Sequence, residues 1–153
     1  MLKKYVSLKE ALQKAKAFCA YQERCHFEVK GKLFDYGLSV NEVDEIVAVL
    51  IEENYLNEER FAIMFAGGKF RIKQWGRVKI RYELKLKQIS AINIKKALAQ
   101  IDEDDYLNML TKQYDIYFNK QNGIQQIKKI KTLKYLQSKG FEIDVINDVA
   151  KNY

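Results

Sequence analysis

The sequence contains no proline, and glycine occurs only seven times in 153 residues. Proline interrupts a helix because it lacks the backbone N–H and because its ring clashes with the preceding turn. Its absence therefore favours a mainly helical chain. Apolar residues make up 48% of the sequence, which is enough for a hydrophobic core and excludes wholesale disorder.

Long apolar segments are also absent. No apolar run approaches the roughly 20 residues that a helix needs to cross a bilayer. The start of the chain, Met1-Leu2-Lys3-Lys4, leads into polar, amphipathic sequence. We therefore expect no membrane segment and no signal peptide, and we expect the protein to be cytoplasmic.

Residues that bind metals or carry out catalysis are scarce. Cys19 and Cys25 are six residues apart, and the single histidine, His26, follows the second cysteine. Zinc sites need about four ligands, usually with a closer cysteine spacing, so we expect reduced, structural cysteines, no metal and no other cofactor. There is no Walker-type phosphate loop. The acidic run at 102–105 is typical of a helix start, and the sequence favours a protein that is not an enzyme.

Positive charge is concentrated rather than spread. The net charge is +7, and the segment 69–87 alone has this charge, with eight basic residues and one acid, Glu83. The basic residues of this run are Lys69, Arg71, Lys73, Arg77, Lys79, Arg81, Lys85 and Lys87. Six lysines and no acid lie in 120–139, and a second, weaker patch there comprises Lys128, Lys129, Lys131 and Lys134. Such segregation predicts basic surface patches that bind phosphates or acidic groups, although a solvated face is the alternative.

The chain repeats itself at intervals of 51 and 52 residues. The segments 38–43, 89–94 and 141–146 align, and the alignment extends to Leu33, Leu84 and Leu136. The tripeptide Tyr55-Leu56-Asn57 returns as Tyr106-Leu107-Asn108. We predict three repeats, at 1–54, 55–103 and 104–153. Each is too small for an ample core of its own, so the repeats should stack into an elongated molecule.

Local signals predict three helices in each repeat. Ser7-x-x-Glu10 and Ser39-x-x-Glu42 have the spacing of capping boxes, and Gly37 and Gly140 stand where a helix ends in a left-handed turn. The expected helices cover about 8–20, 24–36, 40–53, 58–73, 77–88, 91–101, 104–119, 123–138 and 142–151.

One segment also fits a strand. From Val78 to Lys87, apolar and charged residues alternate strictly, which is the pattern of a half-buried strand. The repeat favours a helix here, because Leu84 aligns with leucines of segments that read as helical.

The middle repeat resembles the RecX family. The resemblance rests on the stretches 55–62, 69–71 and 76–89, where the residues that match the family pattern are Gly76, Ile80, Glu83, Leu84, Lys87 and Ile89. Gln88 departs from it, since the family usually has glycine there, and Asn57 stands where aspartate is common. Three such repeats are the family's architecture, so the resemblance covers nearly the whole chain.

The resemblance implies an all-α, elongated, curved, monomeric protein. It implies binding in the groove of the RecA–DNA filament and restriction of filament growth, ATP hydrolysis and strand exchange. We expect the basic run to contact RecA or DNA, with Trp75 either stacking there or lying in the core. The alternative is a general nucleic-acid-binding helical protein without a recombinase partner, which the net charge alone would suggest.

Overall fold

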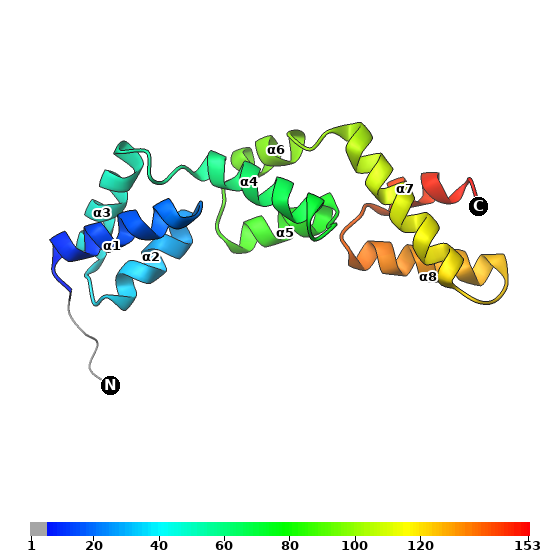
Figure 1. The fold of residues 1–153 in the computed structure, drawn as a ribbon, viewed down its shortest axis with the longest axis horizontal. Coiled ribbons are helices and arrows are strands. Elements are labelled where there is room, and N and C mark those ends of the chain that lie inside the picture. Colours follow the sequence, from blue (N-terminus) through cyan, green and yellow to red (C-terminus); the bar gives the residue numbers. More distant parts are fainter. Residues whose placement is uncertain (1–5) are drawn as a thin grey trace.

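A computed structural model describes residues 6–153, and within this range all regular structure is helical (Figure 1). The helices are α1 (Leu8–Tyr21), α2 (His26–Asp35), α3 (Val40–Glu52), α4 (Glu58–Arg71), α5 (Arg77–Leu86), α6 (Ala91–Ala99), α7 (Glu103–Lys120), α8 (Gln125–Ser138) and α9 (Ile143–Ala150). None of these helices is long and apolar enough to cross a membrane.

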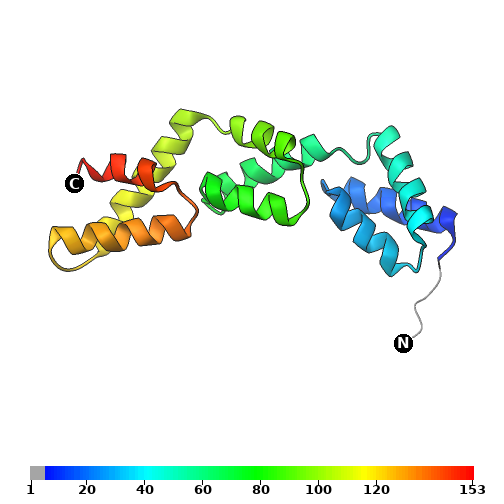
Figure 2. The ribbon, with the colours of Figure 1, turned by 180° about the vertical axis from the view of Figure 1, so that it is seen from behind.

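The predicted all-α fold of three tandem three-helix repeats is confirmed. Helices α1–α3, α4–α6 and α7–α9 pack mainly within their own groups, which we call repeats 1, 2 and 3. Figures 1 and 2 show the repeats in a row, with the two ends of the chain at opposite ends of an elongated molecule. The exact limits of the repeats stay predictions. The limit predicted between residues 103 and 104 falls inside the first turn of α7.

The helix starts follow the predicted signals only in part. Ser39 and Glu42 form the full capping box, in which each side chain accepts the other residue's backbone N–H. The Ser7 side chain accepts the N–H of Glu10, but within the described residues the Glu10 carboxylate does not accept the N–H of Ser7. The other caps include Asn57 and Asp102, whose side chains satisfy the first free N–H groups of α4 and α7.

The turn after the second helix has the same geometry in all three repeats. Gly37 and Gly140 adopt φ values of 84° and 94°, and Gln88 adopts a φ of 60° at the equivalent position. The left-handed backbone conformation is strained for every residue except glycine and, to a lesser degree, asparagine. The departure of Gln88 from the family pattern therefore leaves the turn intact but strained.

The repeated tripeptide turns out not to be structurally equivalent. Tyr55-Leu56-Asn57 precedes α4, and Asn57 is its cap, whereas Tyr106-Leu107-Asn108 lies inside α7. The true counterpart of Asn57 is the cap Asp102. The register shifts because α6 has 9 residues and α3 has 13.

The strand alternative for 77–88 is wrong, because this segment contains helix α5. Ile80 and Leu84 lie four residues apart and are fully buried. Val78, Tyr82 and Leu86 follow the same spacing on an exposed side of the helix. Two helical rows, offset by two residues, thus produce an alternation that resembles a strand.

The core has two parts. One lies within repeat 1, around residues such as Val29, Leu33 and Leu50. The other runs without interruption through repeats 2 and 3. There the ring of Tyr106 lies 5.7 Å from that of Phe70 and 5.4 Å from that of Phe141, so aromatic packing crosses from one repeat to the next.

The joint between repeats 2 and 3 is formed by two glycines in close contact. The N–H of Gly76 donates to the carbonyl of Lys139 at 2.8 Å, and the N–H of Val78 donates to that of Gly140 at 2.9 Å. The carbonyls that directly follow α8 thus satisfy N–H groups at the start of α5 that have no partner in their own helix. A Cβ on Gly76 would lie 2.3 Å from the carbonyl oxygen of Gly140, so only glycine fits.

Arg77 closes the same joint. Its Nε lies 2.8 Å from Glu142, and its Nη1 lies 2.9 Å from Glu103. Its guanidinium stacks over the ring of Tyr106. The Tyr106 hydroxyl accepts a hydrogen bond from the backbone N–H of Arg77 and donates one to Glu142. Burial alone would lower the pKa of Arg77, but the two carboxylates outweigh it and hold the pKa above its usual value. Burial and the bond to Glu142 raise the pKa of Tyr106.

We expect Gly76→Ala to lower the free energy of unfolding by about 1–3 kcal/mol, because the added methyl group must push apart two backbones. Gly31→Ala is the matched control. A Cβ there meets nothing within 4 Å, and alanine in the middle of α2 should raise stability by about 0.5–1 kcal/mol. Urea denaturation followed by circular dichroism measures both, and equal effects would contradict the tight joint.

We expect Arg77→Gln to lower the free energy of unfolding by about 1.5–3 kcal/mol, since two charge-assisted bonds are lost in a half-buried site. The side chain of Arg77 is only 20% exposed. Arg81→Gln, which removes an exposed arginine from the same helix, should change stability by less than about 0.5 kcal/mol. Thermal unfolding compares the two variants, and a similar loss of stability in both would mean that the Arg77 contacts do not stabilise the joint.

Candidate interaction surface

The second helix of each repeat lies along one edge of the molecule. Both views show α2, α5 and α8 following one another along this edge (Figures 1 and 2). The basic run occupies the end of α4, the turn after it and α5. The weaker lysine patch lies on α8. The fold thus brings the predicted residues of repeats 2 and 3 to neighbouring helices.

Four cations of the basic run are exposed and available. They are Arg71, Lys73, Arg81 and Lys85. Within residues 6–153, none of them forms an ion pair. These are the residues that can reach a phosphate or a carboxylate of another molecule without first breaking a bond within the chain.

Two other predicted binding residues hold the molecule together instead. Arg77, which we had expected to share the binding face, is fixed by its two carboxylates in the joint between repeats 2 and 3. Lys87 lies 3.4 Å from Glu28 of repeat 1. Both sites were predicted from charge alone, and sequence separations of 59 and 65 residues concealed their partners.

Trp75 binds the remaining cations of the run. The ammonium of Lys69 lies 5.1 Å from the centre of its ring, and that of Lys79 lies 4.7 Å from it. The indole is half-buried and packs against the core of repeats 2 and 3. Trp75 is therefore mainly a packing residue, and Tyr82, which is 61% exposed, is the aromatic residue free to stack on a partner.

A hollow of about 340 Å³ between α5 and α6 gathers three cations. Arg81, Lys85 and Lys95 line it, over an apolar floor that includes Ile94 and Leu98. No acid lines this hollow. The sequence pointed to Arg81 and Lys85 but missed Lys95, which lies on the next helix and outside the basic run.

The weaker patch on α8 divides in the same way. Lys131 and Lys134 are exposed, whereas Lys129 is half-buried. The half-buried Lys128 lies 4.3 Å from the centre of the Phe118 ring. Arg81 and Lys85 of α5 and Lys131 and Lys134 of α8 are thus exposed cations on two successive helices along this edge of the molecule, and we call these four residues the basic edge.

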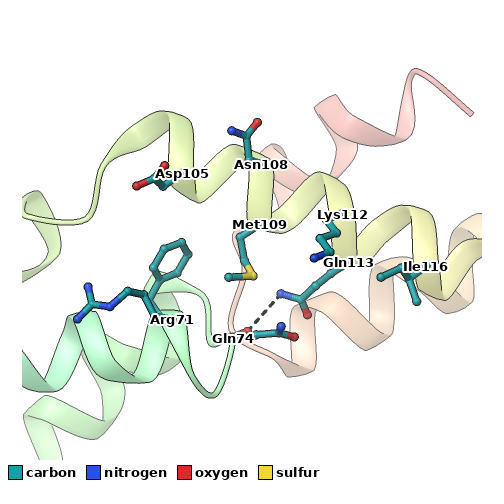
Figure 3. Close-up of a pocket in the computed structure, with 9 residues that line it drawn as sticks. Arg71, Gln74, Asp105, Asn108, Met109, Lys112, Gln113 and Ile116 are labelled. Atoms are coloured by element: carbon teal, nitrogen blue, oxygen red, sulfur yellow. Dashed lines mark hydrogen bonds between the residues drawn. The ribbon is translucent and has the colours of Figure 1, made fainter.

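A separate hollow lies between α4 and α7. Phe70 of α4 and Met109 of α7 line it, and Figure 3 shows Met109 with Arg71 and Asp105 on one side and Lys112 on the other. Gln113 donates to the carbonyl of Gln74 at 3.4 Å and links the two repeats below it. This hollow could not be predicted from the sequence, because its walls come from different repeats.

The cysteines and the histidine show no sign of a reactive site. Both thiols are buried, and burial raises the pKa of Cys19 and raises that of Cys25 to about 11. Burial also lowers the pKa of His26. No three His, Cys, Asp or Glu side chains between residues 6 and 153 are placed to hold a metal ion together.

The family model and the relatives described below carry the same family description. The family model described as "RecX, second three-helix domain" matches residues 57–98, which contain α4–α6. A regulatory protein RecX of Clostridium perfringens is 29% identical over 128 residues, and one of Lactobacillus johnsonii is 30% identical over 142 residues. These alignments cover 81% and 92% of this chain but only 59% and 52% of the relatives. The corresponding protein of Prosthecochloris aestuarii is 27% identical, with coverage of 90% and 89%.

Two solved structures share the fold. The crystal structure of RecX from Lactobacillus salivarius superposes with a TM-score of 0.88 and covers 95% of both chains at 20% identity. A second crystal structure of regulatory protein RecX gives a TM-score of 0.82, also at 20% identity, and covers 95% of this chain and 74% of the other. The family model, the relatives and the arrangement of nine helices in residues 6–153 agree, and the chain belongs to the RecX family.

Proposed function

We propose that this protein is a monomeric, cytoplasmic, non-enzymatic regulator that binds a RecA filament on DNA and limits its growth, its ATP hydrolysis and strand exchange. The observation that carries the proposal is the basic edge, with its unpaired cations on α5 and α8. Stacked repeats form extended binding surfaces, and the cations lie on the second helices of two successive repeats, which suits a filament as the partner.

The chemistry of the basic edge supports contact with a polyanion. Arg81, Lys85 and Lys95 surround one hollow without an acid, so a phosphate there meets three positive charges. Exposed cations of this kind release counterions when they bind DNA, which makes the affinity depend on salt. Carboxylates on the recombinase subunits would be attracted by the same charges.

We expect Arg81→Glu combined with Lys85→Glu to weaken binding to RecA filaments on single-stranded DNA by at least about tenfold at low salt. The slope of log K against log salt should become shallower by about 1.4, since each lost phosphate contact on single-stranded DNA removes about 0.7. Fluorescence anisotropy at several salt concentrations measures both quantities.

The matched control is Lys9→Glu combined with Lys14→Glu. Both lysines are exposed on α1, and the control changes the net charge by the same amount. Its effect should be much smaller. If both variants lose the same affinity, only the overall charge matters, and the basic edge has no special role.

ATP hydrolysis by RecA on single-stranded DNA tests the proposed activity itself. We expect this protein to suppress hydrolysis when present at far fewer copies than RecA, because blocking growth at few points affects whole filaments. Higher salt should weaken the suppression. Unchanged hydrolysis, together with tight binding to bare DNA, would instead support a general nucleic-acid-binding protein.

A further inference from the structure

The hollow between α4 and α7 is an apolar cavity with an open side. Its volume is about 360 Å³, which falls within the range of binding pockets. Phe70 of α4 and Met109 and Ile116 of α7 provide apolar surface. Ile116 is 46% exposed. Repeats 2 and 3 each supply one wall, so the cavity exists only because the joint holds them together.

The cavity continues in both directions as a groove. Toward α6 it meets a second hollow of about 300 Å³, which shares Phe70, Arg71 and Asp105 with it. Toward α8 it meets a smaller hollow of about 120 Å³, which shares Gln74, Gln113 and Ile116 and reaches Tyr135. We call this continuous surface the α4–α7 groove.

The rim of the groove carries charges of both signs, and the acids lie only at one end. Asp102 and Asp105 lie at the α6 end, and Lys112 and Lys120 lie toward the α8 end. Arg71 lies on the same side as Asp105 and lines the same two hollows. Within residues 6–153, none of these side chains forms an ion pair. An apolar centre with a charged rim is the pattern of a protein interface.

Nucleic acid suits this groove poorly. Phosphates would approach Asp102 and Asp105 at one end, and apolar side chains such as Phe70 and Met109 line the centre. A protein segment with both apolar and charged residues satisfies all three features at once. Amphipathic helices bind grooves of this kind through apolar anchors spaced three or four residues apart.

We propose that the α4–α7 groove binds an amphipathic helix of the recombinase subunit. An apolar side chain of that helix fills the cavity at Phe70 and Met109. Its acidic residues face Lys112 and Lys120, and its basic residues face Asp102 and Asp105. This inference rests on the proposed function and adds to it a protein-only contact, separate from the basic edge.

The test uses the full chain with Lys112→Glu and Ile116→Ser. Both residues are exposed, so the fold should be kept. Binding is measured to RecA filaments on single-stranded DNA and to the same DNA without RecA. We expect filament affinity to fall about tenfold or more, since charge repulsion joins the loss of an apolar contact at the centre of an interface. Affinity for bare DNA should match that of the control.

The control is Lys9→Glu with Ile51→Ser, which makes the same chemical changes elsewhere. Ile51 is also 46% exposed, and the net charge changes equally. Filament affinity equal to that of this control would overturn the proposal, as would an equal loss on bare DNA, which would make the groove a nucleic-acid contact. If the unaltered chain fails to bind filaments, the proposed function fails, and the groove proposal fails with it.

Discussion

The contact between Gly76 and Gly140 is the constraint on which the rest of the arrangement depends. It lets the start of α5 donate to the end of α8 at 2.8 and 2.9 Å, so two helix ends satisfy each other. This contact sets α5 and α8 in sequence along the basic edge. It also brings α4 next to α7, which creates the groove and joins the cores of repeats 2 and 3.

The joint between repeats 1 and 2 uses equivalent positions with different residues. His26 begins α2 as Arg77 begins α5, and Ser90 caps α6 where Glu142 precedes α9. Ser90 donates to Glu58 at 3.0 Å within repeat 2, so its position contributes no charge to the joint. Ion pairs such as Arg60–Glu23 and Lys87–Glu28 connect the repeats instead. These pairs are about as buried as the Arg77–Glu142 pair, and Cys25 of repeat 1 packs into the core of repeats 2 and 3, so the two joints are formed by different contacts.

The sequence predicted the helices well because their signals are local. Caps such as Ser39 and turn residues such as Gly37 act within a few positions, and the repeat resolved the ambiguous segment 77–88 correctly. Contacts between repeats left no such signal. The partners of Arg77 are 26 and 65 residues away, so the sequence predicted binding from its charge but could not predict its two ion pairs in the joint. The groove could not be predicted for the same reason, since neither wall is apolar enough alone to attract notice.

The division of the basic run shows why net charge is a poor measure of a binding surface. Arg77 and Lys87 are paired with acids, and Lys69 and Lys79 lie over Trp75. Arg71, Lys73, Arg81 and Lys85 remain free of such partners within residues 6–153 and are exposed. A partner that recognised only charge would therefore experience a weaker field than the sequence suggests. In the proposed function, specificity would depend on how the free cations are spaced along the basic edge, and the joint between repeats 2 and 3 sets the relative position of α5 and α8.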